Sequence, residues 1–143
     1  MKLSSKSKTQ SMGKCFEALA KSFLIQQHLT FIQANSHCRF GEIDLIMLDD
    51  QTLCFVEVRY RSKPSFSSAL ASIDNKKYSK LEKSAQYWLQ QHPQYKQHFC
   101  RFDCIGIEPM LDKAASNNTL NQFHLISHNN QSYKLFWVKN AFI

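Results

Sequence analysis

Residues 41–61, GEIDLIMLDDQTLCFVEVRYR, combine five acidic side chains with two otherwise apolar stretches. Read with a period of two, each stretch is typical of a short β-strand. The polar segment DDQT between them is rich in residues that favour turns, so the whole segment predicts a β-hairpin. On the first strand, Ile43 and Leu45 are expected on one face, with the acids at 42 and 44 on the other.

The acids of this hairpin are expected to oppose one another. A turn centred in DDQT places Asp44 opposite Glu57, and Glu42 opposite Arg59. The second pair is complementary, but like charges directly opposite each other on a sheet are destabilising. Because this hairpin is so apolar, we expect it near the centre of a sheet. Repulsion between two carboxylates is more destabilising in such a buried position. A divalent cation is the simplest group that would offset it.

Length and composition suit one domain. The chain has 143 residues, of which 43% are hydrophobic, enough for a core. We expect a domain over residues 12–143, preceded by a basic flexible arm over residues 1–11. No apolar run approaches the roughly 20 residues of a membrane span, and the arm lacks the apolar region of a secretory signal. Five cysteines without a C-x-x-C pair predict reduced thiols in the cytoplasm.

The charge balance favours an anionic partner. Lysine and arginine outnumber the acids 18 to 11, which gives a formal net charge of +7 and a pI near 9.2. A basic domain of this kind favours nucleic acid over a membrane surface, since no strongly amphipathic basic helix of the membrane type is evident.

Hydrophobic periodicity predicts the order α-β-β-β-α-β-β-β. The first helix is expected to follow an N-cap at Ser11, and a Ser-rich loop is expected over residues 62–72. The segments outside the first hairpin are predicted as helices over 12–28 and 73–91, and as strands over 29–34, 98–107, 122–128 and 133–143. This order predicts an α/β domain with a mixed central β-sheet flanked by helices.

The hairpin acids have the spacing of a hydrolytic magnesium site. Asp44 on one strand and Glu57 on the next would fix a hard cation through carboxylate oxygens. Arg59, two residues along the same face, would hold a phosphate or the attacking water, while the cation acts as a Lewis acid. The alternative is a structural charge cluster in which Arg59 and Arg61 neutralise Glu42, Asp44 and Glu57.

Further charged residues are candidates on position alone. Glu17 borders the apolar stripe of the first helix, and it either points at the sheet or lies in solvent. Lys76 and Lys77 begin the second helix and would either bind a backbone phosphate or form a solvated basic face. Arg61 and Lys63, in the loop after the hairpin, are further candidates for electrostatic contact with DNA.

The sequence resembles the YraN-like family of small bacterial proteins, which in turn resemble PD-(D/E)xK nucleases and archaeal Holliday-junction resolvases. The resemblance rests on GEIDLI and FVEVRYRS, supported by GKCFEALA, IDNKKYSKL and CRFDCI. It implies a restriction-endonuclease-like fold and a Mg²⁺ or Mn²⁺ cofactor. It also implies Asp44 and Glu57 as metal ligands, Glu17 as an accessory acid, and Arg59 at the lysine position of the motif.

The function implied by this resemblance is metal-dependent endonuclease action on DNA, including branched or junction DNA. The alternative is a non-catalytic nucleic-acid-binding module that keeps the fold, because arginine, unlike lysine, does not give up a proton. A third interpretation is a protein-interaction role in which the acids are structural. The sequence is also compatible with a homodimer.

Overall fold

The computed structural model describes residues 5–62, 75–110 and 123–141, with side chains from residue 12 onward. The predicted fold class is confirmed, with one mixed sheet and two flanking helices, and a short 3₁₀ helix is added to the predicted order. The elements are α1 Ser5–Gln26, β1 Thr30–Cys38, β2 Gly41–Asp49, β3 Thr52–Tyr60, α3 Asn75–Gln91, η1 Pro93–Tyr95, β4 Phe99–Pro109, β5 His124–His128 and β6 Gln131–Val138.

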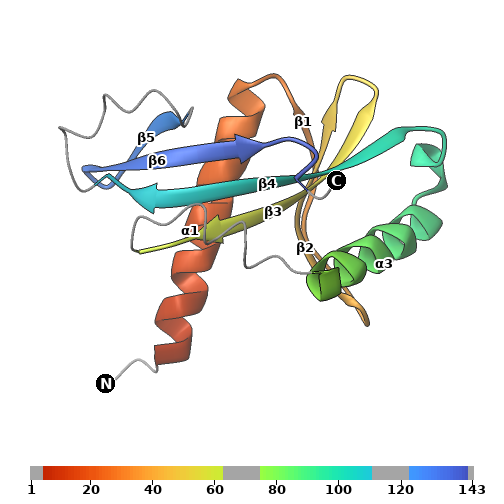
Figure 1. Cartoon of the computed structure of the whole chain (residues 1–143), viewed down its shortest axis with the longest axis horizontal. Helices are drawn as coiled ribbons and strands as arrows, with labels where there is room; N and C mark the ends of the chain where they lie inside the picture. Colours follow the sequence, from red (N-terminus) through yellow and green to blue (C-terminus); the bar gives the residue numbers. More distant parts are fainter. Residues whose placement is uncertain (1–4, 63–74, 111–122, 142–143) are drawn as a thin grey trace.

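A single six-stranded sheet has the order β1-β2-β3-β4-β6-β5. Strands β3 and β4 are parallel, and every other neighbouring pair is antiparallel. A parallel pair needs a crossover connection, and α3 lies within the one between β3 and β4 (Figure 1). The first hairpin therefore ends in a strand at the middle of the sheet.

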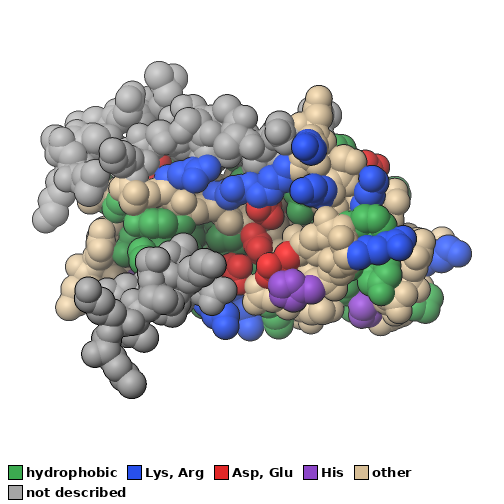
Figure 2. Space-filling view, turned by 90° about the horizontal axis from the view of Figure 1, so that it is seen from below, with side chains coloured by type: hydrophobic (Ala, Val, Ile, Leu, Met, Phe, Trp, Pro, Cys, Tyr) green, Lys and Arg blue, Asp and Glu red, His purple; other side chains and the backbone are tan. Residues whose placement is uncertain are grey.

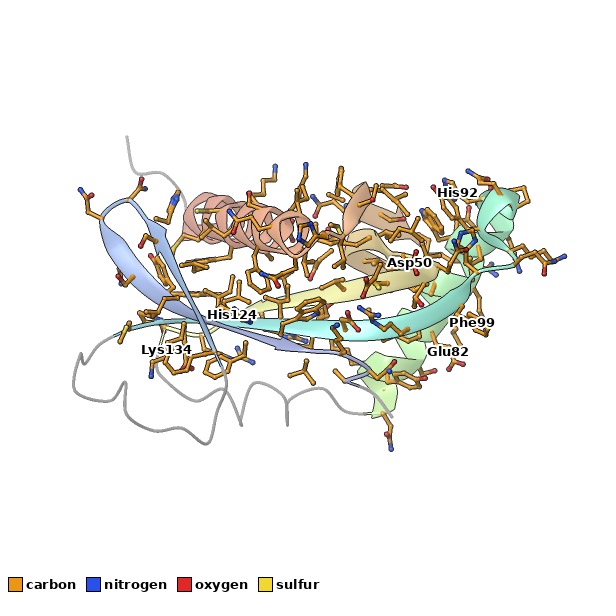
Figure 3. The ribbon with its side chains drawn as sticks, turned by 90° about the horizontal axis from the view of Figure 1, so that it is seen from above. Asp50, Glu82, His92, Phe99, His124 and Lys134 are labelled. Atoms are coloured by element: carbon orange, nitrogen blue, oxygen red, sulfur yellow. The ribbon has the colours of Figure 1, made fainter. Side chains whose placement is uncertain are left out.

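The two helices cover opposite faces of the sheet (Figure 3). Helix α1 buries the stripe Phe16, Ala20 and Leu24, at helical spacing, in one apolar cluster. Helix α3 buries Ala85 and Trp88 in a second cluster. Both faces of the sheet are therefore shielded from solvent where the helices pack on them.

The first hairpin has the predicted register. Leu48 pairs with Leu53, and Leu45 pairs with Val56. Its apolar side chains divide between the two clusters: Leu45, Met47, Cys54 and Val56 pack on the α1 side, and Ile46, Leu53 and Phe55 pack on the α3 side. Burial on both faces explains why these strands read as nearly continuous apolar runs.

The alternation of β2 breaks at Asp44. Ile43 packs on the α3 side although Leu45 packs on the α1 side, so the expectation that they share a face is wrong. The β2–β3 pairing stops at Leu45, and the β1–β2 pairing omits the step between Asn35 and Asp44. Asn35 has a φ of 53°, which turns β1 out of regular extension here.

Several predicted boundaries shift. Helix α1 begins at Ser5 and runs through Ser11, so the expected N-cap is wrong and residues 5–11 of the predicted arm are helical. No glycine or proline precedes Gly13 to stop the helix. Strand β1 continues to Cys38 because it pairs with β2 that far.

The predicted Ser-rich loop lies largely outside the described residues, and so does Lys63. None of the described helices is both long and apolar enough to cross a membrane.

Candidate functional site

Acidic side chains from α1 and β2 meet where the strand pairing is interrupted. Glu17 comes from α1, and Glu42 and Asp44 come from β2, with carboxylate oxygens that all lie within 4.8 Å of one another. Glu17 therefore points inward, which was one of its two predicted orientations.

The end of the β2–β3 pairing fixes the position of Asp44. Beyond Leu45 the backbone of β2 no longer pairs with β3. The Asp44 carboxylate replaces a backbone carbonyl of β2 as the acceptor, because Val58 N donates to Asp44 Oδ2 at 2.9 Å. A backbone donor that would cost free energy if buried without a partner is thereby satisfied by the candidate ligand itself.

Asn35 holds two of the acids from β1. With its amide oriented so that the nitrogen faces the carboxylates, it donates to Glu17 Oε2 and to Glu42 Oε1, each at 2.8 Å. His37 Nε2 lies 3.7 Å from the same Glu42 oxygen. The expected Glu42–Arg59 pair is therefore not formed, because the β2–β3 pairing stops before it. Asn35 carries no sequence signal for this role, since a single loop-forming residue indicates only a turn.

Glu57 is held by two cations on one oxygen. Arg59 Nε lies 3.2 Å and Lys77 Nζ lies 2.9 Å from Glu57 Oε1. The Arg59 contact is one of charge, because its buried Nε–H has no aligned hydrogen-bond acceptor among the described residues. Glu57 itself is only 8% exposed, so its charge depends on these two partners.

The pKa of Asp44 shows the predicted repulsion between Asp44 and Glu57. Burial first, and the charge of neighbouring Glu57 second, raise the pKa of Asp44 to about 8, although the hydrogen bond from Val58 N lowers it. Burial also raises the pKa of Glu57, against the opposing charge of Arg59. The pKa of Glu17 is raised by burial and by Glu42. The metal-free cluster therefore resists full ionisation near neutral pH.

Two cavities flank these acids. The first, of about 270 Å³, has Asp44 and Glu57 on its sheet side and Lys77 and Lys80 on its helix side. The second, of about 490 Å³, lies on the α1 side and is lined by Lys14, Glu17, Asn35, His37 and Glu42. Figure 2 shows acidic side chains gathered near the middle of one face, with basic side chains on both sides.

The structure does not bring every predicted residue to this place. Lys76 is exposed, and Arg61 is half-buried at the end of β3 with its backbone N–H bonded to Ile107 O. Neither is among the described residues that line the two cavities. Lys63 lies outside the described residues.

Asp103 on β4 is a separate, structural acid. It is fully buried and accepts hydrogen bonds from Arg101 Nε, Trp137 Nε1 and Asn140 N at 3.0 to 3.2 Å. An acid with this many donors is already satisfied and ties β4 to the end of β6.

The donor set fits a hard divalent cation. Mg²⁺ and Mn²⁺ prefer oxygen ligands, and the cluster offers carboxylate oxygens from three side chains on two elements, α1 and β2. Burial and then the charge of Glu57 raise the pKa of Asp44 to about 8, so cation binding near neutral pH would release a proton. Glu42 joins the candidate ligands, which sequence reasoning missed by pairing it with Arg59.

Fold and site together define a small α/β protein with a carboxylate cluster beside a cleft that is lined by both acids and lysines. The chain belongs to the family described as Uncharacterised protein family UPF0102, whose model matches residues 16–107. The predicted YraN-like membership is thereby confirmed.

Relatives in several bacteria support this membership. The chain is 39% identical to a UPF0102 protein of Stutzerimonas stutzeri over 95% of this chain and 98% of the relative. It is 45% identical to one of Alcanivorax borkumensis, over 70% of this chain and 80% of that protein. It is 40% identical to one of Nitrosomonas europaea, over 91% and 92%. Their shared description states no activity.

Proposed function

We propose that this protein is a divalent-metal-dependent endonuclease that hydrolyses phosphodiester bonds in DNA. One observation carries the proposal: carboxylates from α1, β2 and β3 converge beside a cleft whose opposite wall carries Lys77 and Lys80. Phosphodiester hydrolysis needs this opposition, because a cation site must lie next to donors for the phosphate oxygens.

In this mechanism the acids hold the cation and the lysines hold the phosphate. Glu17, Glu42 and Asp44 would bind Mg²⁺ or Mn²⁺. Glu57 lies next to them and lines the cleft. When bound, the ion would supply Lewis acidity and would lower the pKa of a water molecule at the site. Lys77 and Lys80 would orient the scissile phosphate through its non-bridging oxygens.

The charge distribution supports nucleic acid as the substrate. Four of the eleven acids in the chain lie in the site. A net charge of +7 therefore leaves a basic surface for the phosphate backbone around it. The preference for DNA, and for branched or junction structures, follows from the family resemblance alone.

The five cysteines are free thiols, which favours the reducing cytoplasm as the setting.

A cleavage panel tests the proposal. Single-stranded, duplex, flap and four-way-junction DNA would be incubated with Mg²⁺, Mn²⁺ or chelator. We expect metal-dependent cleavage by wild type and a loss of at least about 100-fold in Asp44→Asn, since even indirect supports of a metal ligand are worth about 10- to 100-fold. Asp49→Asn is the matched control, because Asp49 lies at the hairpin turn and pairs with Arg101 at 2.8 Å.

A non-catalytic nucleic-acid-binding module is the second candidate. It is favoured by the arginine at position 59, where the E-x-K pattern has a lysine, because a guanidinium cannot act as a general base. Retention of DNA without cleavage in any metal would select this candidate. Absence of both cleavage and DNA binding at low salt would refute both.

A further inference from the structure

We infer that Lys77, carried by α3, supplies the cleft cation that an E-x-K pattern would supply from β3, and that Arg59 instead is a half-buried counter-charge that holds Glu57 in place. The inference rests on the proposed function and deepens it, because it names the group that contacts the scissile phosphate.

The two cations on Glu57 differ in where they face. Lys77 Nζ lies 2.9 Å from Glu57 Oε1, and Lys77 lines the cleft together with Asp44 and Glu57. Arg59 approaches the same oxygen at 3.2 Å but is not among the described residues that line this cleft. Its side chain is 20% exposed, against 34% for Lys77. A substrate in the cleft therefore meets the amine of α3 before the guanidinium of β3.

The chemistry of an ammonium group suits this position. Lysine has three N–H donors on one nitrogen. Lys77 can therefore keep its contact with Glu57 while it donates to a phosphate oxygen. Arg59 contacts Glu57 through charge alone, since its buried Nε–H lies 3.2 Å from Glu57 Oε1 without an aligned hydrogen bond.

The start of α3 adds to the anion site. Lys77 is in the first turn of this helix, which begins at Asn75. Backbone N–H groups and the helix dipole favour negative charge there. Lys80 lies three residues on, so the two lysines project from the same side of the helix into one cleft. The scissile phosphate would thus lie between a helix wall of amines and a sheet wall of carboxylates.

A rate-and-affinity comparison tests this role. The variants are Lys77→Met, Lys77→Arg and Arg59→Met, with Lys83→Met as the matched control. Lys83 is an exposed lysine of the same helix that is not among the described residues lining either cavity. Single-turnover cleavage of a labelled duplex and of a four-way junction would be measured in Mg²⁺. Binding would be measured in Ca²⁺, and melting temperatures in chelator.

We expect Lys77→Met to lower the cleavage rate by about 100-fold or more, the cost of removing one preorganised donor. Its dissociation constant should rise by less than about 10-fold. Its melting temperature should fall no further than that of Arg59→Met, because each substitution leaves buried Glu57 with one of its two described cations. Lys77→Arg should recover part of the rate because it keeps the charge. Arg59→Met should lose mainly thermal stability, because buried Glu57 then keeps only one of its two described cations.

A Lys77→Met protein that cleaves within about three-fold of wild type overturns the inference while leaving the proposed function standing. Equal rate losses in Lys77→Met and Lys83→Met also overturn it, since they would reflect net charge alone. A wild type that cleaves no substrate in any metal refutes the proposed function, and the role of Lys77 with it.

Discussion

Replacing Asp44 by asparagine should stabilise the metal-free protein near neutral pH. The substitution keeps an oxygen acceptor for Val58 N, which donates to Asp44 Oδ2 at 2.9 Å. It removes a negative charge from beside Glu57 and Glu17, both of which raise the pKa of Asp44. The repulsion is thereby relieved without loss of the hydrogen bond that closes the strand pairing.

The magnitude follows from the pKa of Asp44, which rises from 3.8 to about 8 on folding. A pKa raised in the folded state means that the protonated group favours folding. This contribution is fully present below about pH 3.8 and is lost as the pH rises through about 8. Each pH unit in that window costs about 1.4 kcal/mol. Allowing for sharing of protons with Glu57, the ionised Asp44 costs about 2–4 kcal/mol at pH 8, or roughly 5–15 °C in melting temperature.

Thermal melts in chelator between pH 4 and pH 8.5 measure this effect. We expect Asp44→Asn to match wild type near pH 4 and to exceed it increasingly as the pH rises. Mg²⁺ should raise the melting temperature of wild type but not of Asp44→Asn, because a ligand stabilises the state that binds it. Asp49→Asn, the control, should be destabilised because Arg101 loses a charged partner at 2.8 Å.

The opposite pattern would refute the reasoning. If the acids were a structural charge cluster, removing one carboxylate would leave buried positive charge without its partner. Asp44→Asn would then melt below wild type in chelator at pH 8, and wild type would be indifferent to metal.

Three further predictions concern the surroundings of the cluster. DNA affinity should fall steeply with salt, with a log–log slope of about −3 or steeper if Lys80 and its neighbours release phosphate counterions; a flat titration would contradict this. Arg59→Lys should keep Mn²⁺-dependent cleavage at or above the wild-type level, since it adds a second amine near Glu57, and a strong loss in rate assays would show that the guanidinium geometry is needed. Asn35→Gly, which tolerates the φ of 53°, should weaken Mg²⁺ binding by about 10-fold in calorimetry because Glu17 and Glu42 lose a shared donor; unchanged affinity would assign Asn35 a backbone role only.

The hairpin register could be predicted because its determinants are local. Alternation and a four-residue turn placed Leu45 opposite Val56, as the structure has it. The start of α1 was placed seven residues too late, since the segment before Gly13 has neither a breaker nor a strong apolar stripe. Polar residues of moderate helix propensity leave such a boundary undetermined.

The site could be predicted only in part, because some of its contacts depend on residues far apart in the sequence. That Asp44 lies near Glu57 could be predicted from the hairpin register, although the pairing itself stops one residue earlier, at Leu45. The Lys77 contact with Glu57 depends on how α3 crosses the sheet, and no short-range pattern encodes that crossing. Glu42 was assigned to Arg59 by extending a pairing that the structure ends at Leu45.

The interruption at Asp44 is the feature that joins fold to chemistry. A fully paired β2 would bond Val58 N with backbone, and its acids would stand on one face of a regular strand. Instead both neighbouring pairings omit Asp44, and its carboxylate bonds Val58 N while lying among the oxygens of Glu17 and Glu42. A fold under no functional constraint has no reason to combine lost sheet pairing with clustered like charges, since both are destabilising. Their coincidence at one residue favours a bound cation more strongly than either would alone.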